Sequence, residues 1–219
     1  MLNIILIFNT INYRQIPIFI KTTKVLNDHI YLSLLWIFYC AFHSIFAAPK
    51  VKRFFSHLMK HQFKYYRIIY SLFAGVTLVM LVYIQFATLS KRLFTSSIIY
   101  YLGALILLLP GLAIMILCIR KYFYELSGIQ ALNNEPLHIT LQKDGLHKYM
   151  RHPLYSGTLM FVWGLFCMIP YLSNLIACAI MTIYVLIGII FEEQKLRVEF
   201  GNEYIEYSKE VKMLIPRIL

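Results

Sequence analysis

Long apolar runs separated by short basic segments constrain the fold of this chain more than any other feature of its sequence. Each run is long enough, at about 1.5 Å per residue, to cross most of a hydrocarbon core of roughly 30 Å. We interpret residues 30–48, 66–86, 98–119, 154–169 and 171–191 as membrane spans. The fourth run is the shortest, and we expect it to pack inside the helical bundle. The pattern predicts an all-α integral membrane protein with about five transmembrane helices.

The composition agrees with this class. Of the 219 residues, 60% are hydrophobic and only 14% are charged, a balance far from that of a soluble domain. We expect one membrane domain over residues 30–219. Residues 1–29 form a patchy apolar lead-in without a cationic start or a small-residue cleavage site, so they do not resemble a signal peptide. We interpret the lead-in as an interfacial segment or as sequence from an upstream start codon.

The positive charges predict the orientation of the chain. The net charge is +11, but most of the 21 Lys and Arg residues lie in the loop at residues 49–67, in the segment before Pro153 and in the C-terminal tail. The positive-inside rule places these segments in the cytoplasm, which gives an outside N-terminus and an inside C-terminus. Because no basic domain stands apart from the spans, we expect the lipid bilayer and not nucleic acid as the partner.

Polar and aromatic side chains gather where the fourth run begins, in the sequence GLHKYMRHPLYSG at residues 145–157. Pro153 suits the first turn of a helix, and it forces His152 into an extended conformation. The free N–H groups of that first turn favour a negative ligand group. Arg151 and Tyr155 flank the junction, so we expect a polar site where the loop meets the membrane.

The fourth and fifth runs are separated only by Pro170 and a few neighbours, which predicts a C-terminal helical hairpin. The hairpin would return Glu192 and Glu193 to the membrane face that carries Arg151 and His152. Ionisable groups at that depth usually have a partner or a ligand. Neighbouring helix positions point about 100° apart, so the sequence leaves open which of the two acids faces the site.

A cytoplasmic amphipathic helix is expected to follow the hairpin. Gly201 is placed to stop the fifth helix, and Tyr204 and Tyr207 would share one face of the next helix until Pro216. A solvated charged extension with a surface helix is the alternative that the sequence leaves open.

Other polar residues carry weaker signals. His57 and His61 are four apart but lack an evident third ligand, so no metal site is expected. His43 is either a core hydrogen-bonding group or part of a substrate pocket. The cysteines all lie within the predicted spans, and we interpret them as small core residues. They are Cys40, Cys118, Cys167 and Cys178.

Together, the motifs of the C-terminal part resemble the isoprenylcysteine carboxyl methyltransferase superfamily, which includes the phospholipid methyltransferases. The motifs are RHPLYSG at residues 151–157, EExxL at 192–196, FGxxYxxY at 200–207 and the closing proline at 216. They define a catalytic part at residues 138–216. The earlier spans are similar to the subgroup of methanethiol S-methyltransferases, NnrU-like proteins and nurim, through FHS at 42–44, YRIIY at 66–70 and YELSG at 124–128.

The resemblance implies an S-adenosylmethionine site on the cytoplasmic side. Glu192 would bind the amino group of the cofactor, and Tyr155 would lie against the sulfonium. Arg151 would hold an anionic group, or alternatively anchor the helix start at the lipid headgroups. Implied catalytic residues are Glu192, Arg151 and Glu193. Implied cofactor-binding residues are Leu141, Gln142, His147, His152, Pro153, Leu154, Tyr155 and Glu192, with backbone contacts from residues 139–142. The family often has Tyr or Phe at the position of His147.

One departure from the family pattern restricts which methyl acceptor the chain is expected to bind. Prenylcysteine enzymes carry an arginine for the substrate carboxylate shortly before the glutamates, where this chain has Gly188 and Ile189. We therefore expect methyl transfer to a small or lipophilic nucleophile, with a thiol such as methanethiol preferred, at the inner membrane of a bacterium. Alternatives are a prenylcysteine carboxyl or phospholipid methyltransferase, an NADPH-dependent reductase of the sterol-reductase type, and a non-catalytic nurim-like membrane protein.

Overall fold

The computed structural model describes residues 18–95, 97–127 and 140–215, and these residues confirm the all-helical fold class. Apart from one isolated bridge between Arg92 and Tyr171, the described residues contain no β-structure. The first 17 residues of the predicted lead-in lie outside the described part of the chain. The helices are α2 (Ile18–Ala47), α3 (Pro49–Met59), α4 (Tyr66–Ala87), α5 (Ile98–Ser127), α6 (Pro153–Met168), α7 (Leu172–Phe200) and α8 (Asn202–Glu210), with 3-10 turns η1 (Lys60–Tyr65) and η3 (Gly145–Lys148).

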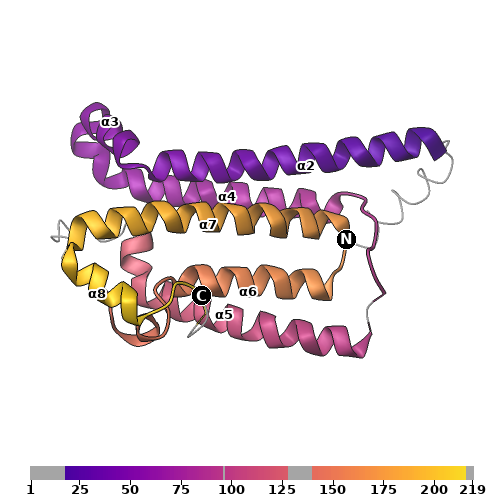
Figure 1. Cartoon of the computed structure of the whole chain (residues 1–219). Helices are drawn as coiled ribbons and strands as arrows, with labels where there is room; N and C mark the ends of the chain where they lie inside the picture. Colours follow the sequence, from indigo (N-terminus) through magenta and orange to yellow (C-terminus); the bar gives the residue numbers. More distant parts are fainter. Residues whose placement is uncertain (1–17, 96, 128–139, 216–219) are drawn as a thin grey trace.

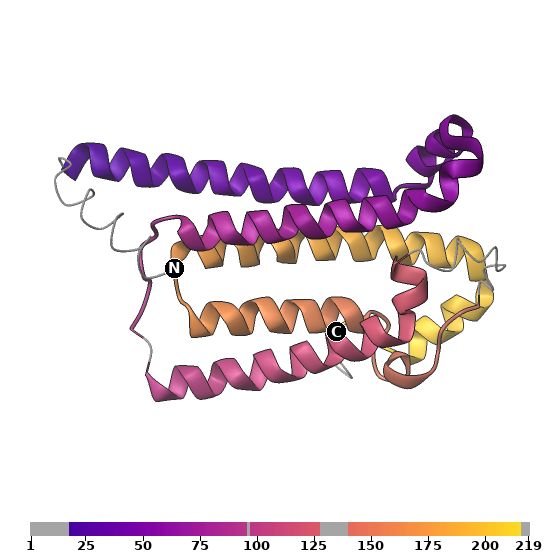
Figure 2. The same ribbon diagram turned by 180° about the vertical axis from the view of Figure 1, so that it is seen from behind.

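The long helices lie side by side, and the short ones gather at one end of the bundle (Figures 1 and 2). α2, α4 and α7 pack together on one side, and α6 lies between α7 and α5. α3, α8, the C-terminal end of α7 and the kinked end of α5 share one end of the molecule. The polar junction before α6 therefore lies at the same end as the C-terminal end of α7.

Four helical segments of the described chain are long and apolar enough to cross a membrane: Val25–Ala47, Pro49–Ala87, Ile98–Tyr122 and Leu172–Phe200. α6 is also apolar, but it has only 16 residues and is shorter than these four. The multi-pass membrane class is thus supported, while the count of five spans stays a prediction. Many large apolar side chains on α2, α4 and α5 are exposed, as expected for surfaces that face lipid.

The prediction of a basic loop at residues 49–67 is wrong, because most of this segment is helical. α3 begins with Pro49 at its first turn, where a missing N–H costs nothing, and η1 continues the segment to α4. None of the residues of α3 is buried. Its apolar and basic residues alternate with helical spacing, so α3 is an amphipathic surface helix rather than an irregular connection.

The apolar core of α2, α4 and α7 is centred on Trp36. Leu32, Trp36, Leu81 and Ala177 form a buried cluster. A buried polar chain crosses the same helices, since the indole of Trp36 donates to Gln85 at 2.7 Å and the amide of Gln85 donates to Asn174 at 2.7 Å. In an apolar environment unpaired polar groups are costly, so these bonds fix the register of the three helices.

Close contact between α5 and α6 depends on glycines. A Cβ at Gly164 would lie 2.8 Å from the backbone nitrogen of Leu108, and one at Gly111 would lie 2.7 Å from that of Phe161. A Cβ at Gly157 would meet Ile114 at 2.9 Å. Small residues allow the backbones of membrane helices to approach closely. This seam holds α6 against α5 and thereby positions the start of α6.

We predict that Gly164→Ala lowers the free energy of unfolding by roughly 1–3 kcal/mol, because the added methyl group collides with backbone atoms that cannot move away. The matched control is Gly103→Ala in α5, where no atom lies within 4 Å of an added Cβ. Thermal unfolding of the detergent-solubilised variants, followed by circular dichroism, compares the two. Equal melting temperatures would contradict the role of the glycine seam.

Candidate active site

The two polar motifs of the C-terminal part lie side by side at the end of the bundle. The Nε atom of Arg151 donates to Oε1 of Glu193 at 2.7 Å, across 42 residues of sequence. His152 lies at the same carboxylate, with 3.0 Å between its Nε2 and Oε1 of Glu193. The start of α6 and the end of α7 are therefore joined by direct side-chain contacts.

Glu193 is the centre of a buried polar network. Its side chain is only 9% exposed, and Oε1 also accepts a hydrogen bond from the hydroxyl of Tyr204 in α8 at 2.8 Å. Arg197 adds a longer contact of 3.8 Å to Oε2. A buried carboxylate needs this many donors and positive charges because it has lost its water. The network fixes three elements, α6, α7 and α8, relative to one another.

The segment after α8 binds back to the start of α6. Arg151 donates through its Nη1 to the carbonyl oxygens of Ser208, at 3.0 Å, and of Val211. The backbone N–H of Arg151 donates to Lys212 at 2.8 Å, and that of His152 donates to Met213 at 3.0 Å. These bonds satisfy polar groups at the first turn of α6 that have no partner within the helix.

The local backbone agrees with these positions. His152 precedes Pro153 and is non-helical, with φ of −122° and ψ of 65°. α7 ends at Phe200, and Gly201 has φ of +54°, a left-handed value that glycine adopts without strain. The turn at Gly201 directs α8 back toward the site, where Tyr204 and Tyr207 are both buried.

Glu192 differs from its neighbour. Its side chain is 42% exposed, and Oε2 lies 3.8 Å from Nδ1 of His152. Glu192 lines a cleft of about 540 Å³ at this end of the bundle, whereas Glu193 is not among the residues that line it. The two ring nitrogens of His152 thus face the two acids, the buried Glu193 on one side and the open Glu192 on the other.

The cleft collects all but one of the residues implied by the resemblance. From the connection before α6 come Leu141, Gln142, His147 and Arg151, and from α6 come Pro153, Leu154 and Tyr155. Residue 139 lies outside the described residues. Thr140 lies in the segment for which backbone contacts were implied, and Leu196 and Phe200 lie in the quoted motifs. Cys118, Tyr122, Lys195 and Glu199 also line the cleft, although they were not assigned to it from the sequence. Helical spacing from Glu192 could have found Lys195 and Glu199, but no sequence pattern indicated Cys118 and Tyr122.

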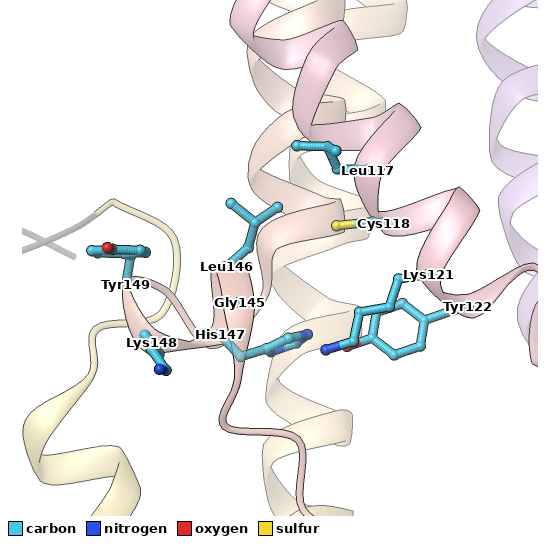
Figure 3. Close-up of a pocket in the computed structure, with 9 residues that line it drawn as sticks. All are labelled: Leu117, Cys118, Lys121, Tyr122, Gly145, Leu146, His147, Lys148 and Tyr149. Atoms are coloured by element: carbon cyan, nitrogen blue, oxygen red, sulfur yellow. The ribbon is translucent and has the colours of Figure 1, made fainter.

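A second hollow of about 560 Å³ shares Cys118, Tyr122 and His147 with the cleft, and Figure 3 shows the residues that line it. Leu146 points toward Leu117 and Cys118 of α5, and His147 points toward Lys121 and Tyr122 (Figure 3). α5 can reach this turn because its helix is interrupted at Tyr122, which has φ of −107° and ψ of 16°.

His147 of η3 is bonded to the residue before His152 and to α8. Its Nδ1 lies 3.1 Å from the carbonyl oxygen of Arg151, and its own carbonyl accepts a 2.6 Å hydrogen bond from Tyr207. Burial lowers the pKa of His147 below its ordinary value of 6.5, with a smaller lowering from Lys121. Burial also raises the pKa of Tyr207 to about 12, so its phenol stays a donor at neutral pH.

Comparison with known proteins agrees with this geometry. The phospholipid methyltransferase family matches residues 98–203, from α5 to the start of α8. Over 192 residues the chain is 28% identical to a methanethiol S-methyltransferase of Crocosphaera subtropica, covering 80% of this chain and 70% of that protein. The chain is thus similar, over residues 98–203, to the superfamily of phospholipid and isoprenylcysteine methyltransferases.

Two further relatives match shorter segments. Methanethiol S-methyltransferase 1 of Bradyrhizobium diazoefficiens is 35% identical over 98 residues, which are 42% of this chain and 34% of that protein. Protein-S-isoprenylcysteine O-methyltransferase B of Arabidopsis thaliana is 34% identical over 80 residues, 36% of this chain and 41% of that protein. In both cases the chain covers less than half of the relative. No solved structure matches the chain.

We predict that Glu193→Gln destabilises the protein by about 3–5 kcal/mol, because it leaves the buried guanidinium of Arg151 without its counter-charge. Glu192→Gln is the matched control and should change stability by less than about 0.5 kcal/mol, since Glu192 is part-exposed. Thermal unfolding in detergent measures both. Equal stability of the two variants would contradict the division of roles between the acids.

We also predict a pH effect from His147. Because its folded pKa lies below the unfolded value, its neutral form is favoured by folding. The associated stability is fully present above about pH 6.5 and is lost as the pH falls through the folded pKa. His147→Gln should therefore show a smaller drop in melting temperature between pH 7.5 and pH 5 than the unsubstituted protein. A matched control is His57→Gln, at an exposed position of α3.

Proposed function

We propose that the chain is an S-adenosylmethionine-dependent methyltransferase whose cofactor binds in the cleft beside Glu192. The observation that carries this proposal is the separation of the two acids. Glu193 is hydrogen-bonded within the buried network, whereas Glu192 is part-exposed and lines the cleft next to His152 and Tyr155. A carboxylate and an aromatic face at one cleft suit a ligand that carries an ammonium and a sulfonium.

The residues of the cleft fit such a cofactor. Its volume of about 540 Å³ lies within the range of small-molecule sites, roughly 300–1,000 Å³. Glu192 would accept hydrogen bonds from the amino group, and Lys195 would face the carboxylate. Tyr155, whose ring lies 5.7 Å from that of His152 and stacks with it, would lie against the sulfonium. Leu154 and Leu196 offer apolar walls for the purine.

When bound, the cofactor supplies an electrophilic methyl group for an in-line displacement. The protein's share of such a reaction is alignment and exclusion of water. The Glu193 network contributes by fixing His152 at the cleft wall, because Nε2 of its ring is bound to Glu193 at 3.0 Å. Arg151 serves this network through three side-chain hydrogen bonds, and we assign it a positioning role.

The acceptor is proposed to be a small thiol such as methanethiol. Several relatives are named methanethiol S-methyltransferases. The position of Gly188 supports a small neutral group, since a Cβ there would lie 4.0 Å from the hydroxyl of Tyr155. Position 188 therefore borders the cleft residue Tyr155, and it offers no cation for a substrate carboxylate. A phospholipid or prenylcysteine would need recognition that this position does not provide.

We further propose that the cleft faces the cytoplasm of a bacterial cell. The cleft lies at the end of the bundle that carries α3 and the segment before α6. Together with the C-terminal tail, residues 49–67 and the segment at residues 120–152 hold 16 of the 21 Lys and Arg residues of the chain. The positive-inside rule assigns that end to the cytoplasm, where the cofactor is made.

We predict that isothermal titration of the solubilised protein shows binding of S-adenosylmethionine and none of NADPH. Glu192→Gln should weaken cofactor binding about tenfold or more, because a charge-assisted hydrogen bond contributes about 1.5–3 kcal/mol. Glu206→Gln is the control, since Glu206 pairs only with Lys209 on the exposed face of α8. Binding of NADPH instead, or equal affinity of the two variants, would overturn the cofactor assignment.

The acceptor is tested by adding methanethiol and S-adenosylmethionine and measuring dimethyl sulfide in the headspace. Production of dimethyl sulfide by the unsubstituted protein supports the thiol. Cofactor binding without dimethyl sulfide would transfer the assignment to a lipid or prenyl acceptor, which radiolabelled methyl transfer to membrane extracts would then identify.

A further inference from the structure

A second group of polar side chains lies inside the apolar helices α2 and α4, away from the Glu193 network. The hydroxyl of Tyr70 lies 2.7 Å from Nδ1 of His43 and donates to the carbonyl oxygen of His43 at 2.8 Å. The rings of Tyr39 and Tyr70 both stack with that of His43. Ionisable groups within membrane helices are costly and are usually functional.

The two contacts of Tyr70 determine the state of the imidazole. A phenol has one hydrogen, and Tyr70 uses it for the carbonyl oxygen. The contact with Nδ1 is then satisfied only when Nδ1 carries a hydrogen and donates it to Tyr70. In this tautomer Nε2 of His43 carries the lone pair, and it has no hydrogen-bond partner among the described residues. His43 thus presents an available base.

The base lies at a cavity. A space of about 290 Å³ is lined by His43, Ala47, Lys52, Tyr66, Arg67, Tyr70, Ser71 and Ala74. Lys52 and Arg67 have no ion-pair partner within residues 18–95, 97–127 and 140–215, and Lys52 also lies in the field of Lys195 from the cofactor cleft. Unpaired cations at a small cavity stabilise a negative charge inside it.

Tyr184 of α7 connects this cavity with the cofactor cleft. Its hydroxyl accepts a hydrogen bond from Ser44, the neighbour of His43, at 3.1 Å. Gly188, one helical turn after Tyr184, leaves open space beside Tyr155. Ser44, Tyr184 and Gly188 therefore link the neighbour of His43 to Tyr155 at the proposed cofactor cleft.

We propose that this cavity binds the methyl acceptor and that His43 converts it from a thiol to a thiolate. The proposal rests on the proposed methyltransferase function. The thiolate is the nucleophilic form, and an alkyl thiol like that of cysteine, with a pKa of about 8.5, is mostly protonated at pH 7. Lys52 and Arg67 favour the charged form, and Tyr70 positions the imidazole. The class of substrate is a small alkyl thiol without a charged group of its own.

The proposed step is balanced. Nε2 of His43 takes the proton of the thiol and becomes charged, and the thiolate attacks the methyl carbon of S-adenosylmethionine. A sulfur–carbon bond forms in the methyl sulfide as the sulfonium–methyl bond breaks. The electron pair of that bond stays on S-adenosylhomocysteine. His43 then releases its proton to solvent through the basic end of the cavity.

We predict that His43→Gln lowers turnover of methanethiol about 100-fold or more, as expected for loss of a general base. S-adenosylmethionine affinity should be unchanged, because His43 lies outside the cofactor cleft. An aromatic thiol, which is already ionised at neutral pH, should lose less than about threefold, since it needs no base. His57→Gln is the matched control, at an exposed position of α3 outside the cavity.

A second measurement does not depend on turnover. Methanethiol is added to the protein saturated with S-adenosylhomocysteine, and the ultraviolet absorbance of bound thiolate is recorded at pH 7. The unsubstituted protein and His57→Gln should show the thiolate band, and His43→Gln should not. Tyr70→Phe should retain the fold and show a reduced band, because Nδ1 then lacks its partner.

The outcomes separate the two proposals. Failure of the unsubstituted protein to bind S-adenosylmethionine overturns the proposed function, and binding without methylation of any thiol overturns the thiol as its acceptor. Methylation by the unsubstituted protein together with normal turnover and a normal thiolate band in His43→Gln overturns the acceptor site alone. The groups that surround His43 and contribute to any pH profile are Tyr39, Cys40, Lys52, Tyr66, Arg67, Tyr70 and Tyr184.

Discussion

The buried carboxylate of Glu193 is the interaction on which the functional end of the molecule depends. It receives Arg151 and His152 from the start of α6 and Tyr204 from α8. Its negative charge is costly at this depth unless every donor is in place, so the three elements can dock in only one arrangement. Because the next residue back along α7 is rotated by about 100°, the same docking turns Glu192 outward to the cleft.

The sequence predicted the parts of the fold that follow from hydropathy and charge. Apolar runs gave the helices, and Pro153 marked the start of α6, because these signals act within one helical segment. The helical state of residues 49–67 was not predicted, since their basic residues lower the hydropathy and obscure the amphipathic spacing. The glycine seam at Gly111, Gly157 and Gly164 was also missed, because glycine shows its packing role only when the partner helix is known.

The residues of the candidate site were likewise predicted only in part from the sequence. Residues near the two motifs were found, because Arg151, His152 and the two glutamates are polar groups at membrane junctions. The contribution of Cys118 and Tyr122 was not found, because it depends on the interruption of α5 and on how that helix approaches η3. Which acid is buried could not be decided either, because only the docking of α8, through Tyr204, distinguishes Glu193 from Glu192.

The two polar regions of the bundle have different electrostatic characters, and this difference suits a methyl transfer. The C-terminal helices offer an open carboxylate at the proposed cofactor cleft, which favours a cationic donor. The N-terminal helices offer Lys52 and Arg67 with the free nitrogen of His43, which favours an anionic acceptor. A donor and an acceptor of opposite charge attract strongly where water is scarce, and their charges cancel as the methyl group moves. α7 contacts Ser44, the neighbour of His43, through Tyr184 and lines the proposed cofactor cleft through Glu192, so one helix links the two regions.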